Sequence, residues 1–383
     1  MSLAALAPRL GVGSRHLRRL FRRHVGASPA AVVRVRRAFL AKQLITDSGL
    51  PLTQVALGAG FGSLRRFNAV MQATFGCAPR DLRRSAASAS SKVTLRLAYR
   101  PPYDWTGVLA FLAQRAIPGV ESVEHGIYSR TIAVGGARGI VEVRMAPDPF
   151  LLATITVDRL PALAAIVARL RHLFDLDADP DPIAAHLGRD PVLAPRLAHH
   201  AGLRVPGAWD SFELAVQAML EQRVGLAAAS ALTARLAATF GERISAPRSS
   251  NGGLRLLFPD ARTLARADLS SIGLPRARAA ALSALATLAA RESAFPRTSR
   301  PLEHTTAELR GLAGIGDWTV EPVAMRALRA PDAFPAGDVG LLRAMRRDMA
   351  RTSPALLERR AERWRPWRAY AAMLLWLDGA DAS

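Results

Sequence analysis

Cysteine is almost absent from this chain of 383 residues, which carries only Cys77. One thiol cannot form a disulfide within the chain, and it cannot supply a cysteine-ligated zinc site or an iron–sulfur cluster. The sequence therefore suits a reducing cytoplasm. We expect Cys77, which follows a glycine at the end of a predicted helix, to be buried rather than reactive.

Long apolar runs are absent as well. The most apolar stretch, "AYAAMLLWL" at 369–377, is far too short to span a bilayer. Residues 1–13 lack the basic and apolar regions of an export signal. We therefore predict neither a membrane anchor nor export.

Lysine is scarce, because only Lys42 and Lys92 stand beside fifty arginines. The net charge is nevertheless +21 and the pI is about 11.6, which favours a polyanionic partner: nucleic acid first, an acidic membrane second. A compositional bias of the source genome would produce the same excess of arginine without any meaning for binding. Charge alone therefore leaves two interpretations open.

Half of the residues of the chain are apolar, so a globular protein of two to four domains is expected.

A repeat at an offset of fifty residues organises positions 1–84. In the repeat, apolar residues four apart share one helix face, and each face is followed by Gly and Pro, which end helices. This pattern predicts two helix–turn–helix units in tandem, with a small-polar linker at 85–91. The aligned residues are Leu17, Phe21, Val25, Gly26 and Pro29 with Phe67, Met71, Phe75, Gly76 and Pro79.

The rest of the chain divides into two further regions. Residues 92–180 alternate like half-buried strands and include two helical stretches, which predicts a small antiparallel α+β domain. Residues 181–383 predict an all-α domain of eight to ten helices. The whole is thus a multidomain, mainly α protein. The predicted strands are 92–99, 131–134, 139–146 and 151–157, and the helical stretches are 105–116 and 160–174.

Two glycines, Gly314 and Gly316 of "LAGIGDWTV", stand just before a helix-forming run. They form either a tight connection between helices or a turn whose backbone N–H groups approach a phosphate closely. The preceding helix "TTAELRGL" completes a helix–hairpin–helix, and the basic charge favours the phosphate interpretation. Eighteen residues after Val320 stands Asp338, which can cap a helix, serve as a buried carboxylate, or both.

These motifs resemble a known family. "LRGLAGIGDWTVEPVAMRAL" followed by "DAFPAGDVGL" resembles the helix–hairpin–helix DNA glycosylase superfamily, and within it DNA-3-methyladenine glycosylase II. The stretches at 207–229 and 363–376 agree with that branch, so the resemblance covers about 92–378. Residues 56–79 resemble the AraC-type transcription regulator domain. Together they resemble fusions of an adaptive-response regulator with a glycosylase.

Such fusions commonly begin with a zinc-bound, cysteine-rich methyl-acceptor domain. A chain whose only cysteine is Cys77 contains no such domain. The chain also begins at the first helix of the first helix–turn–helix, without the scaffold helix that precedes it in the family. We therefore expect a chain truncated relative to these fusions.

The resemblance implies a monofunctional DNA glycosylase that flips an alkylated purine out of the duplex and hydrolyses its N-glycosidic bond, as in base excision repair. Asp338 would be catalytic, because a carboxylate stabilises positive charge at C1′ and can orient water. Purines of the 3-methyladenine and 7-methylguanine type already carry positive charge and need no strong general acid. No lysine follows Lys92, so no Schiff base can form in the helical region.

The resemblance also assigns the base pocket. Trp318 and Trp367 match aromatic walls that hold the flipped base, although for either one a core position is equally expected. A cation against a tryptophan face gains roughly 0.5–2 kcal/mol over its neutral parent. Phe212 and Pro322 complete the predicted pocket, and Pro322 stands where a tyrosine can stand.

The remaining predictions concern DNA and ions. Gln222 and Arg223 match the wedge that fills the gap left by the flipped nucleotide. The carbonyls of Arg310, Leu312 and Ile315 match positions that hold Na⁺ or K⁺, and we predict no other cofactor. The eight histidines show no metal-ligand spacing. The predicted DNA contacts further comprise Gly314, Ile315 and Gly316 of the hairpin and Arg18, Arg19, Arg22, Arg65 and Arg66 of the helix–turn–helix units.

The predicted partners are double-stranded DNA with alkylated bases, and promoter DNA with RNA polymerase. We expect a monomer in the bacterial cytoplasm, associated with the nucleoid. The alternative is a transcription regulator of an alkylation response whose glycosylase domain is inactive and only binds DNA.

Overall fold

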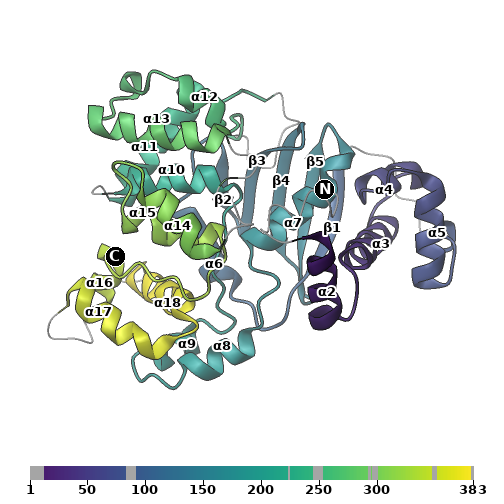
Figure 1. Cartoon of the computed structure of the whole chain (residues 1–383), viewed down its shortest axis with the longest axis horizontal. Coiled ribbons are helices and arrows are strands. Elements are labelled where there is room, and N and C mark those ends of the chain that lie inside the picture. Colours follow the sequence, from purple (N-terminus) through teal and green to yellow (C-terminus); the bar gives the residue numbers. More distant parts are fainter. Residues whose placement is uncertain are drawn as a thin grey trace. The chain divides into compact units, whose positions relative to one another are not determined.

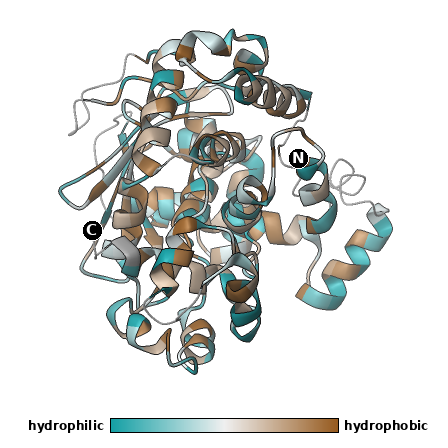
Figure 2. Cartoon of the chain, turned by 90° about the vertical axis from the view of Figure 1, so that its left-hand side faces the viewer, coloured by the Kyte–Doolittle hydropathy of each residue, from teal (hydrophilic) through white to brown (hydrophobic). Residues whose placement is uncertain are grey.

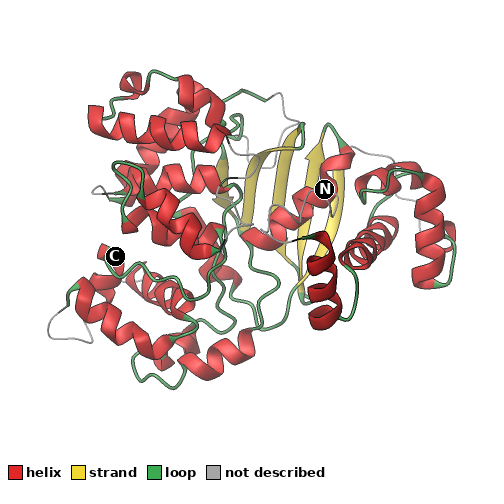
Figure 3. Ribbon diagram, viewed as in Figure 1, coloured by secondary structure: helices red, strands yellow, loops and turns green. Residues whose placement is uncertain are grey.

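The structure, a computed structural model, describes residues 13–82, 92–222, 225–244, 253–291, 295, 301–346 and 352–380. Helices dominate, and the strands form one sheet (Figure 3). The predicted mainly α, multidomain class is confirmed. Brown and teal residues are mixed within many of the helices in Figure 2, as expected for helices that pack on a core with part of their surface. None of the helices in the described ranges is long and apolar enough to cross a bilayer.

The described N-terminal helices agree with the predicted repeat, whose first helix, within residues 1–12, lies outside the described residues. Gly26 and Gly76 end α2 and α5 in the left-handed conformation, at φ 70° and 72°, which glycine adopts without strain. Leu17, Phe67 and Met71 of the repeated apolar faces are buried. The helices are α2 (Ser14–Val25), α3 (Pro29–Asp47), α4 (Leu52–Gly58) and α5 (Leu64–Phe75), and a 3-10 turn spans Pro79–Leu82.

A five-stranded sheet follows, in the order β1-β5-β4-β3-β2 (Figure 1). The sequence predicted four of the strands and missed β2, because its segment "ESVE" has two glutamates among four residues. β2 pairs antiparallel with β3, and Glu121 lies opposite Arg130. Helices α6 (Trp105–Ala113) and α7 (Leu163–Leu173) accompany the sheet. The strands are β1 (Lys92–Ala98), β2 (Glu121–Glu124), β3 (Ile127–Val134), β4 (Ala137–Met145) and β5 (Phe150–Val157).

The remaining described residues form eleven α-helices, slightly more than predicted, and one isolated antiparallel bridge joins Arg243 to Leu256. Many of these helices begin at a side-chain cap such as Asp210, which accepts the N–H groups of Phe212 and Glu213. The helices are α8 (Pro180–Leu187), α9 (Ala194–His199), α10 (Ser211–Glu221), α11 (Leu226–Phe240), α12 (Ala261–Arg266), α13 (Arg276–Arg291), α14 (Leu302–Arg310), α15 (Asp317–Pro322), α16 (Val339–Met345), α17 (Pro354–Ala361) and α18 (Arg368–Ala380).

A π-helical turn, Val323–Ala327, continues directly from α15, and all five of its residues are buried. It carries the charged side chain of Arg326 into the protein interior. The chain separates into two compact units. The first comprises Met1–Leu97, Ile132–Val143 and Leu152–Ala168, and the second comprises Ala98–Thr131, Arg144–Leu151 and Arg169–Ser383. Every predicted glycosylase residue lies in the second unit.

Candidate active site

Asp338 is the N-cap of α16, and two donors hold one of its carboxylate oxygens. Oδ1 accepts the backbone N–H of Leu341 at 2.8 Å and the indole Nε1–H of Trp376 at 2.9 Å. Within the described ranges no group donates to Oδ2, and the residue is half-buried. The carboxylate is therefore fixed in direction while one oxygen stays available to a ligand.

Trp376, which is not among the predicted site residues, lies on α18, the helix that packs against α16. Its half-buried indole ring lies 5.7 Å from the ring of Phe111 on α6. The guanidinium of Arg115 stands over both rings, with its carbon 4.0 Å from the Phe111 centroid and 5.6 Å from that of Trp376. We call Asp338, Trp376, Phe111 and Arg115 the Asp338 cluster.

Trp367 occupies the other end of the same helix. It immediately precedes α18, nine residues before Trp376, which corresponds to about 13 Å along a helix axis. Its ring packs edge-on against Tyr370 at 5.8 Å, and the Tyr370 hydroxyl donates to Asp175 at 2.8 Å. No contact in the described part of the chain links Trp367 to Asp338. One feature of the sequence pointed to Trp376: it is the last residue of the stretch 363–376, which resembles the glycosylase family.

The other predicted pocket residues are divided between surface and core. Trp318, on the first turn of α15, is half-buried and makes no ring contact with any aromatic residue in the described ranges. Pro322 is half-buried at the end of α15. Phe212, by contrast, is 6% exposed and belongs to the core of the helical region, where it packs edge-on against Phe295 at 6.3 Å.

The hairpin between α14 and α15 has one glycine that its geometry requires. Gly314 has φ +86°, and a Cβ there would lie 2.8 Å from Cβ of Ala281 on α13. Gly316 caps α15 in extended conformation, and a Cβ added there would meet nothing within 4 Å. Ile315 is buried, and its N–H donates to the carbonyl of Leu312 at 3.1 Å.

Arg310, whose carbonyl is one of the predicted cation ligands, uses its side chain within the hairpin. Its guanidinium pairs with Asp317 at 2.7 Å and with Glu321 at 3.1 Å. In the part of the chain that the structure describes, no three His, Cys, Asp or Glu side chains are placed to share a metal ion. The carbonyl site for a monovalent cation stays a prediction.

The predicted DNA contacts are only partly described. The carbonyl of Gln222, which caps α10, accepts a hydrogen bond from Arg278 at 2.9 Å, whereas Arg223 lies outside the described residues. In the helix–turn–helix units the predicted arginines are exposed and so can reach a ligand: Arg18, Arg19 and Arg22 on α2, and Arg65 and Arg66 on α5.

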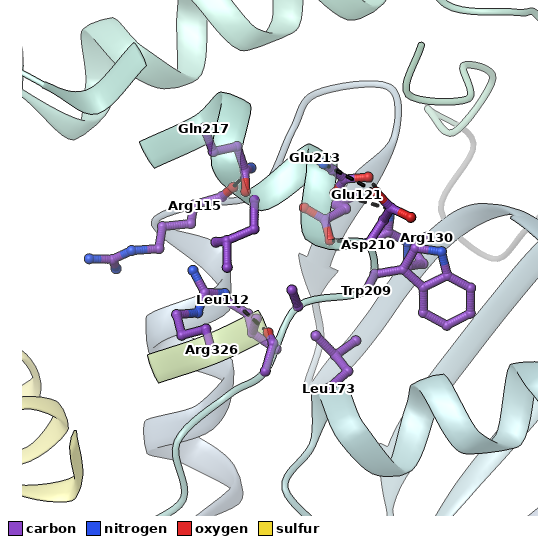
Figure 4. Close-up of a pocket in the computed structure, with 13 residues that line it drawn as sticks. Leu112, Arg115, Glu121, Arg130, Leu173, Trp209, Asp210, Glu213, Gln217 and Arg326 are labelled. Atoms are coloured by element: carbon purple, nitrogen blue, oxygen red, sulfur yellow. Dashed lines mark hydrogen bonds and ion pairs between the residues drawn. The ribbon is translucent and has the colours of Figure 1, made fainter. Parts of the chain in front are cut away.

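A buried ion cluster lies close to this site but uses its charges internally (Figure 4). Arg130 donates to Glu121 at 2.8 Å and to Glu213 at 2.9 Å, and its guanidinium lies 5.0 Å from the Trp209 ring. Burial raises the pKa of Glu213 to about 7, against the opposing effect of Arg130. The cluster joins β2 and β3 to α10, and we regard it as structural.

Comparison with known protein families accounts for most of the chain. Residues 6–85 match a helix-turn-helix domain, residues 94–210 the AlkA N-terminal domain, and residues 216–369 the HhH-GPD superfamily base excision DNA repair proteins. The three matches follow one another along the chain with only short gaps between them.

Individual relatives agree with these matches. The probable bifunctional transcriptional activator/DNA repair enzyme AlkA of Mycobacterium tuberculosis is 37% identical over 381 residues, which cover 98% of this chain and 76% of that protein. DNA-3-methyladenine glycosylase 2 of Escherichia coli is 37% identical over 287 residues, which cover 73% of this chain and 95% of that protein. The 3-methyladenine DNA-glycosylase structure from Archaeoglobus fulgidus has a TM-score of 0.64 at 22% identity, covering 75% and 99%, and supports the fold alone.

Proposed function

Because the chain belongs to the HhH-GPD superfamily of base excision DNA repair proteins, with an AlkA N-terminal domain and an AraC-type helix–turn–helix domain before it, we propose that it is a monofunctional DNA glycosylase. Its substrates are alkylated purines of the 3-methyladenine and 7-methylguanine type in double-stranded DNA. The names of the relatives from Mycobacterium tuberculosis and Escherichia coli support this class of activity.

Asp338 is the observation that carries the proposal. In hydrolysis the bond from C1′ to the base nitrogen breaks, the base leaves with the bonding electrons, and the sugar gains cationic character. Oδ2 of Asp338 has no donor among the described groups, so it can face that cation while Trp376 and Leu341 hold Oδ1. Water then adds at C1′ and loses a proton, which leaves an abasic site.

The base itself would be held by aromatic faces. We assign the wall next to the aspartate to Trp376 in place of Trp367, because Trp376 contacts Asp338 directly. Trp318, half-buried and without an aromatic partner in the described ranges, is the second wall. A cationic purine gains roughly 0.5–2 kcal/mol on such a face over a neutral one. It also departs as a neutral base, so no strong general acid is needed.

The substitution Asp338→Asn tests the catalytic role with little effect on the fold. Asparagine also caps helices, and its amide oxygen can accept the N–H groups of Leu341 and Trp376, so stability should change by less than about 1 kcal/mol. The negative charge is lost, however, and we expect release of 7-methylguanine in single-turnover assays to fall at least about 100-fold.

Two results would contradict the proposal. An Asp338→Asn variant that releases the base at the wild-type rate would remove Asp338 from the reaction. A wild-type chain that binds DNA but releases no alkylated base would favour the alternative of a transcription regulator with an inactive glycosylase domain. Borohydride should trap no covalent adduct, since no lysine follows Lys92.

The helix–turn–helix domain would supply a second, sequence-specific attachment to DNA. The exposed arginines of α2 and α5 support this assignment, as does the name of the Mycobacterium tuberculosis relative, a probable transcriptional activator. Promoter DNA and RNA polymerase are the corresponding partners. In the glycosylase domain, Gln222 and Arg223 are the proposed wedge.

A further inference from the structure

Glu221, the last residue of α10, is a carboxylate that none of the roles above uses. One turn earlier on the same helix, Gln217 donates its amide to the backbone carbonyl of Arg115 at 3.2 Å. Residues four apart share a helix face, so Glu221 lies on the side of α10 that faces Arg115. It is half-buried, and within the described ranges it has no hydrogen-bonding partner.

Two arginines converge on the same place. Arg115 and Arg326 stand over the single ring of Phe111, with guanidinium carbons 4.0 and 4.9 Å from its centroid. Arg326 is 8% exposed and is fixed by hydrogen bonds to the carbonyls of Pro206 and Gly207. Figure 4 shows the Arg115 guanidinium pointing away from the Arg130–Glu213 pair, so that pair does not neutralise it.

Four charges therefore share one neighbourhood. Burial raises the pKa of Glu221, the attraction of Arg115 and Arg326 opposes that rise, and repulsion by Asp338 adds to it, so Glu221 interacts with all three charges. Burial is the main cause that lowers the pKa of Arg326, to about 10, and Arg115 lowers it further whereas Glu221 raises it. Without Glu221, the two guanidiniums would outnumber the single carboxylate of Asp338.

We propose that Glu221 is a specificity-determining residue that offsets Arg115 and Arg326, so that the site beside Asp338 favours cationic occupants over neutral ones. This inference rests on the proposed glycosylase function. A cationic purine and the sugar cation both carry positive charge, and two uncompensated guanidiniums would repel each of them. With Glu221 present, the four side chains sum to zero, and the carboxylates can stabilise the incoming cation.

The substitution Glu221→Gln tests this selectivity because it removes the charge and keeps the shape. The full-length variant is measured against two abasic-site duplexes, one with a cationic pyrrolidine in place of the sugar and one with a neutral tetrahydrofuran. We expect the affinity ratio, pyrrolidine over tetrahydrofuran, to fall about tenfold. Glu358→Gln, which removes an exposed carboxylate on α17, should leave the ratio unchanged within twofold.

A second variant separates charge from shape. Arg115→Gln combined with Glu221→Gln removes one charge of each sign, and we expect it to restore the ratio to within about twofold of wild type. Melting temperatures of all variants check that each is folded. An unchanged ratio in Glu221→Gln, or no recovery in the double variant, would overturn the proposal.

Base release distinguishes this proposal from the function on which it rests. Wild-type protein should release 7-methylguanine, and Glu221→Gln should release it about tenfold more slowly. Hypoxanthine arrives as a neutral base and is opposed only at the sugar cation, so its release should slow less. If hypoxanthine release falls more than 7-methylguanine release, Glu221 donates a proton to the leaving base, and the charge-balancing role is wrong. If wild type releases no alkylated base, the proposed function fails first.

Discussion

At the scale of the residue, Asp338 combines two roles through one oxygen atom. The cap of α16 and the indole N–H of Trp376 both use Oδ1, so the structural contacts do not occupy the oxygen that a sugar cation would meet. A carboxylate in free rotation would spend much of its time turned away from C1′. Holding it in one direction contributes to rate because the arrangement is present before the substrate binds.

Trp376→Phe separates the positioning of Asp338 from stacking against a base. Phenylalanine keeps an aromatic face at this position and deletes the indole N–H that donates to Asp338. We expect single-turnover release of 7-methylguanine to slow about tenfold, with a smaller change in the affinity for substrate DNA.

Trp367→Phe is the matched control, since it makes the same change at the opposite end of α18. It should alter the release rate by less than about twofold, because Trp367 makes no described contact with Asp338. A larger effect at Trp367 than at Trp376 would indicate that Trp367, the residue predicted from the sequence, forms the pocket wall.

At the scale of the element, the hairpin depends on one glycine far more than on the other. At Gly314, alanine would combine a left-handed φ of +86° with a Cβ lying 2.8 Å from Ala281. We expect Gly314→Ala to lower the free energy of unfolding by about 1–3 kcal/mol in urea denaturation and to weaken binding to an abasic duplex.

Gly316→Ala provides the comparison within the same turn. Gly316 has extended backbone and open space around its Cβ direction, so alanine should cost less than about 1 kcal/mol. If Gly316→Ala nevertheless weakens DNA binding as strongly as Gly314→Ala, a phosphate approaches that position closely. If the two variants instead lower the free energy of unfolding equally, the contact of residue 314 with α13 is unimportant for stability.

The sequence predicted well those helices and strands whose structure depends on residues that are close in sequence. Glycines 26 and 76 end their helices as expected, because a left-handed cap is a property of a few consecutive residues. β2 escaped prediction because "ESVE" is paired by its neighbour β3, and its own composition does not favour a strand. The pairing with β3 cannot be read from the composition of "ESVE" alone, although only two residues separate the two strands.

The site divides in the same way. Asp338 could be selected because a lone acid after a glycine-rich hairpin is a sequence feature. Choosing between Trp367 and Trp376 required knowing which end of α18 packs beside the start of α16, which only the tertiary structure provides. Glu221 and Arg115 were missed for the same reason. They come close together only because α10 packs beside the residues that follow α6. The predicted roles of Phe212, Pro322, Gln222 and Arg223 stay predictions.

At the scale of the whole molecule, the positive charge is unevenly distributed. Residues 1–84 contain fifteen basic and two acidic side chains, a net +13 of the +21 carried by the chain. A uniform bias of the genome toward arginine would spread the charge in proportion to length. The concentration in the helix–turn–helix region instead favours a polyanion-binding surface there.

The salt dependence of DNA binding measures how many of these charges contact phosphates. Replacing Arg18, Arg19 and Arg22 of α2 with glutamine removes three exposed guanidiniums. Each phosphate contact contributes about 0.9 to the slope of log K against log salt concentration. We expect the slope for an undamaged duplex, measured by fluorescence anisotropy between about 50 and 200 mM salt, to become shallower by up to about 2.7.

A control variant with the same loss of charge tests whether α2 itself is the contact. Arg189, Arg359 and Arg363 are exposed arginines of the second unit, and their replacement by glutamine lowers the net charge equally. If α2 lies on DNA, this control should change the salt slope by less than the contribution of about one phosphate contact. Release of 7-methylguanine by the α2 variant at saturating protein should stay near the wild-type rate. Equal slopes for the two variants would mean that DNA responds to the total charge of the protein, and α2 would then have no assigned role in binding.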